Sequence, residues 1–213
     1  MQTLRLGDKG EAVKCLQRAL GADPYPVFDE ALQVKVRAFQ ATSGLIPDGI
    51  CGPKTWAALR GFPVVERHSA LTSWGARVRG IEAVVVHHSC TATAAGTAKV
   101  LESRGLSTNF EVDRDGQVIE YGDPTVKVAW HCGGGVNGRS IGIDATHMSG
   151  KPWPEVQSAA VARLLAWLCK IYGLPAVTAP DKSLGKGNLS PAWGVYRHRN
   201  LAATACPEDL PLP

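Results

Sequence analysis

A histidine and a cysteine lie close together near the C-terminal end of this chain, in the polar segment HRNLAATACP that begins at His198. Imidazole nitrogen and thiolate sulfur are both ligands that zinc prefers in proteins, and a catalytic zinc site takes three such ligands and leaves one position for water. His198 and Cys206 can supply two of them from the two flanks of one loop. The sequence therefore predicts a third ligand elsewhere in the chain.

The third ligand is expected at the end of a strand, because a strand positions a side chain more rigidly than a loop does. The apolar run EAVVVHHS predicts a buried strand that ends in His87 and His88. Successive side chains of a strand point to opposite faces of the sheet. Only one of the two histidines can face the metal, and the alternation by itself leaves both open.

The elements around these residues predict a sheet domain with helices. NFEVDRDGQVIEY is typical of a hairpin with Asp-Gly at its turn, and SIGIDATH of another short buried strand. A long amphipathic helix is expected over roughly residues 154–172. Its apolar face is predicted to carry Val156, Ala160, Leu164, Leu168 and Ile171. Strands mixed with helices indicate an α/β or α+β sheet.

The N-terminal part of the chain predicts three short helices instead. Val13 and Leu16 recur at helical spacing, and EALQVKVRAFQATSG predicts a second helix that ends before Gly44. A third helix has Pro53 in its first turn and ends at Gly61. We therefore expect a small three-helix domain over residues 1–61, a linker over 62–70 and a mixed-sheet domain over 71–213.

Composition narrows the functional classes. The 213 residues are 45% hydrophobic and 20% charged, which is typical of a soluble, packed protein. The net charge of +4 is scattered, and no basic stripe with interleaved aromatic residues indicates a nucleic-acid partner. No apolar run approaches the roughly 18 residues of a membrane span, and the N-terminus lacks the form of a signal peptide. We expect synthesis in the cytoplasm and no membrane partner.

The N-terminal part resembles the peptidoglycan-binding domain found at the ends of many cell-wall hydrolases. The matching segments are LRLGDKGEAVKCLQRAL and FDEALQVKVRAFQATSGLIPDGICGPKTWAAL. Asp29 departs from the family, which usually has glycine after the phenylalanine. The resemblance implies that this domain tethers the protein to its polymer.

Positions 71–207 resemble the zinc-dependent N-acetylmuramoyl-L-alanine amidases of the phage-lysozyme and peptidoglycan-recognition-protein type. The resemblance is carried by SWGAR, VVVHHS, STNFEVDRDGQVIEYGD, VAWHCGG, NGRSIGID, and the late histidine and cysteine with the proline that follows them. In that family the first histidine after the apolar strand binds zinc. The resemblance therefore implies Zn²⁺ held by His87, His198 and Cys206.

The same resemblance implies a proton carrier. Related amidases that recycle cell-wall fragments carry a carboxylate where this chain has Asp144, so Asp144 is expected to take a proton from the zinc-activated water and deliver it to the leaving nitrogen. Thr108 stands where phage-lysozyme-type members have a functional tyrosine, and Thr204 where many have a lysine. The missing lysine leaves two outcomes open: slower turnover, or compensation by Arg197 or Arg199.

Four residues are expected to contact the substrate: His131, Asn137, Thr108 and Thr204. Packing is the alternative for His131, and a turn role is the alternative for Asn137. The other histidines, His68, His88 and His147, are expected to be surface or structural residues.

These features together predict a monomeric, modular endolysin that cleaves the amide between N-acetylmuramic acid and L-alanine in bacterial peptidoglycan. Such an enzyme waits inside the cell until a holin-type protein opens the membrane. Two alternatives remain: a non-catalytic peptidoglycan receptor or inhibitor that keeps zinc for structure, and a cytosolic amidase that recycles soluble muropeptides.

Overall fold

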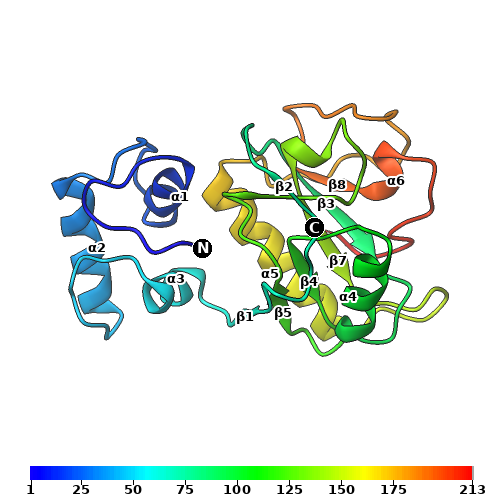
Figure 1. The fold of residues 1–213 in the computed structure, drawn as a ribbon, viewed down its shortest axis with the longest axis horizontal. Helices are drawn as coiled ribbons and strands as arrows, with labels where there is room; N and C mark the ends of the chain where they lie inside the picture. The colour runs from blue at the N-terminus through cyan, green and yellow to red at the C-terminus, as the bar shows by residue number, and fades with distance from the viewer. Residues whose placement is uncertain (213) are drawn as a thin grey trace. The chain divides into compact units, whose positions relative to one another are not determined.

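The computed structural model describes residues 1–212, which form two compact units (Figure 1). Residues 1–63 and 170–173 make up the first unit, and the rest of the described chain makes up the second. Among residues 1–212, no helix combines the length and the apolarity that crossing a membrane requires.

The first unit has three helices, as the sequence predicts: α1 (Glu11–Ala19), α2 (Glu30–Thr42) and α3 (Pro53–Arg60). Asp29, the residue that departs from the family pattern, is the N-cap of α2, and its carboxylate accepts a hydrogen bond from the amide of Leu32 at 2.8 Å. Gly61 ends α3 in the left-handed conformation with φ of 76°. The start of α2 and the end of α3 thus follow from local capping.

A buried glutamine joins α2 to the loop that precedes α3. The amide nitrogen of Gln40 donates to Asp48 Oδ1 at 2.8 Å, to the carbonyl of Ile50 at 2.9 Å and to Thr55 Oγ1 at 3.1 Å. Its oxygen accepts from the amide of Gly49 at 2.9 Å. The loop therefore depends on a single side chain that is 2% exposed.

The second unit is built on a six-stranded mixed sheet in the order β1-β5-β4-β7-β3-β8. The strands are β1 (Val65–Glu66), β3 (Ala83–His88), β4 (Phe110–Val112), β5 (Val118–Glu120), β7 (Ser140–Ala145) and β8 (Val195–Arg197). Only β4 and β5 pair antiparallel, as the predicted hairpin requires. The fold class predicted from the sequence is confirmed.

Two details of this sheet differ from the sequence pattern. Strand β1 lies within the expected linker, yet it pairs parallel with β5 and so belongs to the sheet. A second, two-stranded antiparallel sheet joins β2 (Trp74–Ala76) to β6 (Lys127–Ala129). Strands this short have too few residues for alternation to reveal them.

Helices α4 (Ala94–Ser103) and α5 (Glu155–Tyr172) lie against opposite faces of the sheet (Figure 1). In α5 the predicted apolar face is buried except at one position, because Val156 is 51% exposed. The prediction for Val156 is wrong for a local reason: this first-turn residue lies against Gly116, at the turn of the β4-β5 hairpin, instead of on the sheet.

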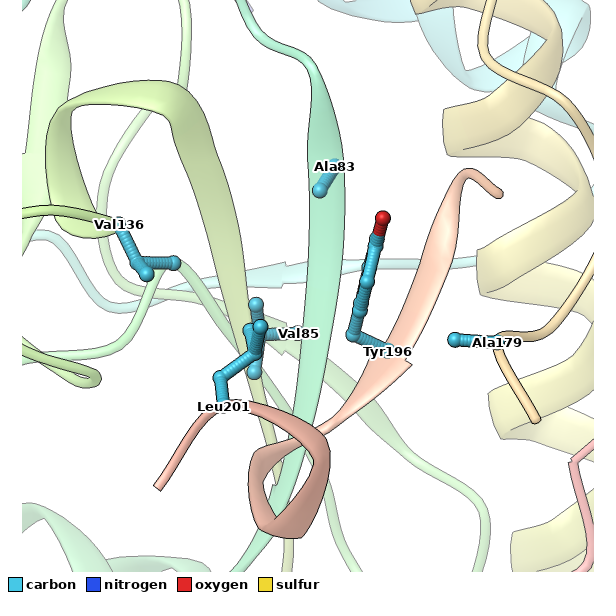
Figure 2. Packing of buried hydrophobic residues seen from close by; sticks show 6 residues of the cluster. All are labelled: Ala83, Val85, Val136, Ala179, Tyr196 and Leu201. Carbon is cyan, nitrogen blue, oxygen red and sulfur yellow. The ribbon is translucent and has the colours of Figure 1, made fainter. Parts of the chain in front are cut away.

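An apolar cluster packs on Ala83 and Val85, in the first half of β3, and supports the elements that carry the site (Figure 2). Val85 of β3 and Tyr196 of β8 are register partners, and Leu201 of α6 (His198–Leu201) belongs to the same cluster. Val85 is two residues before His87, so the two side chains share a face of the sheet. Packing of Leu201 therefore places the start of α6 next to the end of β3. A 3₁₀ turn, η1 (Asn137–Arg139), leads into β7.

Candidate active site

Three side chains from distant parts of the sequence converge at the C-terminal ends of β3 and β8. The ligand atoms of His87, His198 and Cys206 all lie within 4.8 Å of one another. Two imidazoles and one thiol form a donor set that suits zinc. The three residues also line one cavity of about 520 Å³, which leaves space for a substrate beside them. The set therefore fits a catalytic metal ion.

Parallel pairing of strands places the two histidines side by side. Val86 of β3 is the register partner of Arg197 at the end of β8. His87 and His198 are the next residues after this pair, so they leave the two strands at the same level. Their ring centroids are 4.4 Å apart. Asn200 fixes the start of α6, because its side-chain oxygen accepts from the amide of Arg197 at 2.7 Å and its nitrogen donates to the carbonyl of Lys182 at 2.9 Å.

The backbone of β3 holds the cysteine. The amide of His88 donates to Cys206 Sγ at 3.2 Å, and the amide of Arg199 donates to the Cys206 carbonyl at 2.7 Å. Burial raises the pKa of the Cys206 thiol to about 12, and the nearby Asp144 carboxylate contributes to that rise. A metal ion that binds here must displace the thiol proton.

Asp144 lies next to His87 across the sheet, because the two are register partners on β7 and β3. The Asp144 side chain is 5% exposed, and burial raises its pKa to about 7, against a hydrogen bond from Thr108 that lowers it. A carboxyl group with this pKa can accept and return a proton near neutral pH. Asp144 also lines the cavity.

A second buried carboxylate, Glu111 on β4, was missed by the sequence analysis. It is the register partner of Asp144 and is fully buried. Tyr121 Oη donates to it at 2.7 Å and Thr146 Oγ1 at 2.6 Å, and a hydrogen bond from Thr97 adds a third hydroxyl. Burial raises the pKa of Glu111 to about 7. The only signal in the sequence is an acidic residue inside an otherwise apolar strand segment.

The cavity includes some of the predicted substrate residues and leaves others out. His131 and Thr204 line it. Thr108 and Asn137 do not: Thr108 is fully buried, and its hydroxyl hydrogen-bonds with Asp144 and lies 3.0 Å from the carbonyl of Phe110, while Asn137 Oδ1 accepts from the backbone. These two predictions of substrate contact therefore find no support in the geometry.

The arginine at the cavity is Arg104, and not one of the two that the sequence analysis named. Arg104, at the end of α4, lines the cavity, whereas Arg197 and Arg199 do not. Arg199 forms an ion pair with Asp181, with side-chain distances of 2.7 and 2.6 Å, and it donates to the carbonyl of Glu208. Arg199 therefore secures the loop that carries the cysteine, and Arg104 is the arginine that lines the cavity.

His131 contacts a predicted ligand directly. Its Nδ1 atom lies 2.9 Å from Nε2 of His87, and its Nε2 atom lies 3.1 Å from Ser140 Oγ. Burial lowers the pKa of His131 to about 3, so the ring is neutral at pH 7. Its polar atoms are directed into the protein, which favours a supporting role over substrate contact.

The remaining histidines differ in their surroundings. His88 lines the cavity, although the sequence analysis placed it among surface or structural residues. His147 is fully buried and stacks on Trp153 with ring centroids 3.6 Å apart. His68 Nε2 lies 3.1 Å from Glu120 Oε1, away from the cavity.

Two family models match the chain, one for each unit. Residues 77–209 match the family described as N-acetylmuramoyl-L-alanine amidase, and residues 9–59 match a peptidoglycan binding domain family. The first match covers well over half of the chain.

Individual relatives agree with these matches. The N-acetylmuramoyl-L-alanine amidase XlyB of Bacillus subtilis is 27% identical over 138 residues, which are 61% of this chain and 38% of that protein. The chain spans half or less of the length of the curated relatives it matches.

Solved structures show the same fold. The N-acetylmuramoyl-L-alanine amidase LysC from Clostridium intestinale has a TM-score of 0.53 at 19% identity and covers 70% of this chain and 91% of that one. The Ph2119 endolysin from a Thermus scotoductus bacteriophage has a TM-score of 0.53 at 21% identity, with coverages of 70% and 94%. On the match to residues 77–209, the chain belongs to the N-acetylmuramoyl-L-alanine amidase family.

Proposed function

We propose that this protein is a zinc-dependent amidase that hydrolyses the bond between N-acetylmuramic acid and L-alanine in peptidoglycan. The observation that carries the proposal is the convergence of His87, His198 and Cys206 within 4.8 Å at the wall of a cavity. Membership of the amidase family supports the choice of bond. The three ligands would hold Zn²⁺ with one side directed toward the cavity.

Zinc, when bound, supplies a Lewis acid that polarises the scissile carbonyl and lowers the pKa of water. Asp144 stands beside this centre on the neighbouring strand and takes up the proton that the attacking water loses. It then returns that proton to the leaving nitrogen of L-alanine. Arg104 contributes positive charge at the cavity, where the carbonyl oxygen becomes negative during attack.

The N-terminal unit would hold the enzyme on its insoluble substrate. Its match to a peptidoglycan binding domain supports this role. A tether raises the local concentration of the catalytic unit at the wall without altering the chemistry. This arrangement favours an endolysin that acts on the intact wall. Such an endolysin would reach the wall from the cytoplasm once a holin-type protein opens the membrane.

The test is digestion of purified sacculi with the wild-type protein, His198→Ala and the control His68→Ala. The amidase releases stem peptides with free L-alanine amino termini and leaves intact glycan strands. His198→Ala should lose this release, and His68→Ala should keep it because His68 lies away from the cavity. Shortened glycans would identify a glycosidase and overturn the proposal.

The same assay separates the two alternatives. A non-catalytic receptor would sediment with sacculi and bind zinc without releasing amino termini. A recycling amidase would cleave soluble anhydro-muropeptides faster than sacculi. A variant whose N-terminal unit no longer binds the wall would cleave both substrates as fast as the wild type.

A further inference from the structure

A chain of three hydrogen bonds leads from a backbone carbonyl to the first predicted ligand. Ser140 Oγ lies 2.9 Å from the carbonyl oxygen of Val136, 3.1 Å from His131 Nε2, and His131 Nδ1 lies 2.9 Å from His87 Nε2. These residues come from the turn before β7, from the start of β7, from the loop after β6 and from β3.

The direction of this chain is fixed at its first member. A carbonyl oxygen only accepts, so Ser140 must use its single hydroxyl proton on Val136. Ser140 therefore accepts from His131, which places the ring proton of neutral His131 on Nε2. The Nδ1 atom of His131 is then a bare acceptor, and His87 must carry its own ring proton on Nε2. The lone pair of His87 remains on Nδ1.

Two further contacts hold His131 in place. Asn137 Oδ1 accepts from the backbone amides of His131 at 3.3 Å and of Cys132 at 2.8 Å. Gly142 lies under the imidazole: a Cβ atom at this position would stand 2.8 Å from Cγ of His131. The ring therefore occupies space that only glycine leaves open, and its plane stands at 90° to that of His87.

We propose that His131 and Ser140 are positioning residues that fix the tautomer and the ring orientation of His87, so that Nδ1 of His87 is presented to the metal. The inference depends on the metal site in the proposed function. Partners of this kind, behind a metal-binding histidine, typically change metal affinity by about 10- to 100-fold. It also gives Asn137 and Gly142 a purpose, because they hold the backbone and the ring of His131.

The first experiment reads the tautomer itself. A long-range ¹H-¹⁵N spectrum of the ¹⁵N-labelled full chain, after treatment with a chelator, shows which ring nitrogen of each histidine carries the proton. We expect the proton on Nε2 of both His87 and His131. A wild-type spectrum with the proton on Nδ1 of either ring overturns the proposal, and this result does not depend on how any variant folds.

The second experiment measures zinc affinity by competition with a chromophoric chelator at fixed pH. Ser140→Ala and His131→Phe should each weaken zinc binding by about 10- to 100-fold. The matched controls are Ser103→Ala on α4 and His68→Phe near β1, which should bind like the wild type. Variants that fold and keep the wild-type affinity within twofold would overturn the proposal.

The two proposals fail in different ways. If the wild-type protein binds no zinc, the proposed function fails, while the spectrum still decides whether the hydrogen-bond chain sets the tautomer of His87. If zinc binds and sacculi are cleaved but the proton of His87 or His131 is on Nδ1, only the positioning role of His131 and Ser140 is refuted.

Discussion

Glu111 and Asp144 are register partners on the neighbouring parallel strands β4 and β7, and both carboxyl groups are buried. Adjacent strands lie about 4.8 Å apart, so two negative charges here would stand close together in a dry environment. Within the described chain, neither residue forms an ion pair with a basic side chain. Burial raises the pKa of both to about 7, and Asp144 adds to the rise at Glu111. The pair therefore favours the neutral form of one of the two carboxyl groups near neutral pH.

Glu111→Gln should change how stability depends on pH. The folded-state pKa of Glu111, about 7, lies above its ordinary value of 4.5, so the folded wild type binds more protons between these values and loses stability as pH rises through them. The variant lacks this loss. Its free energy of unfolding relative to wild type should increase by about 1–3 kcal/mol between pH 4 and pH 8. Urea denaturation of chelator-treated protein at both pH values measures this change. Exposed Glu66→Gln is the control, and an equal shift there would contradict the argument.

Asp144→Asn should reduce turnover without removing the metal. Loss of a general base typically costs about 10²- to 10⁴-fold in rate. Asp144 acts as a base only when ionised, so wild-type turnover should increase as pH rises through the pKa of its carboxyl group, which burial raises above its ordinary value. The variant should lose this acidic limb of the kcat profile while its zinc content by mass spectrometry stays that of the wild type. A variant with the wild-type profile would exclude Asp144 as the proton carrier.

Gly142→Ala should displace the imidazole ring of His131 and thereby weaken zinc binding. The new methyl group would stand 2.8 Å from Cγ of His131, inside the closest contact that carbon atoms allow, so the ring must move. We expect a loss of about 1–3 kcal/mol in unfolding free energy together with weaker zinc binding. Gly138→Ala is the matched control, because a Cβ there meets nothing within 4 Å. Equal zinc affinity in the two folded variants would show that the position of this ring has no influence on the metal.

Gln40→Ala should affect wall binding and leave the catalytic unit intact. The substitution leaves the buried Gly49 amide without its partner, at a cost of about 1–3 kcal/mol, whereas the Ile50 carbonyl keeps hydrogen bonds from the Gly52 amide and the Thr55 hydroxyl. Sedimentation with sacculi should decrease, while hydrolysis of soluble muropeptides continues at the wild-type rate. Exposed Lys35→Ala on the same helix serves as the control. A parallel loss of soluble activity would show that the two units do not work separately.

Local features of the sequence predicted most of the elements and the types of residue at the site. A proline in a first turn and glycines after helices mark α2 and α3, and Asp-Gly marks the β4-β5 turn, because these residues favour their backbone conformations in any context. The apolar run before His87 predicted a buried strand for the same kind of reason. Residue chemistry alone made His198 and Cys206 candidates for zinc ligands, together with either His87 or His88, and the family resemblance selected His87. The role of these residues as ligands stays a prediction that the measurements above test.

Register decided the rest, because it pairs residues that lie far apart in the sequence. Glu111 and Asp144 become neighbours only when β4 pairs with β7, and no local pattern contains that pairing. Likewise, the direction of the His131 ring depends on a serine and a glycine of β7, and Arg104 reaches the cavity only because α4 packs on the same face. Sequence by itself thus determined which chemical groups the protein has and the elements that carry them. Only the tertiary structure decided which groups share a low-dielectric environment, and this sets their protonation and their hydrogen-bond partners.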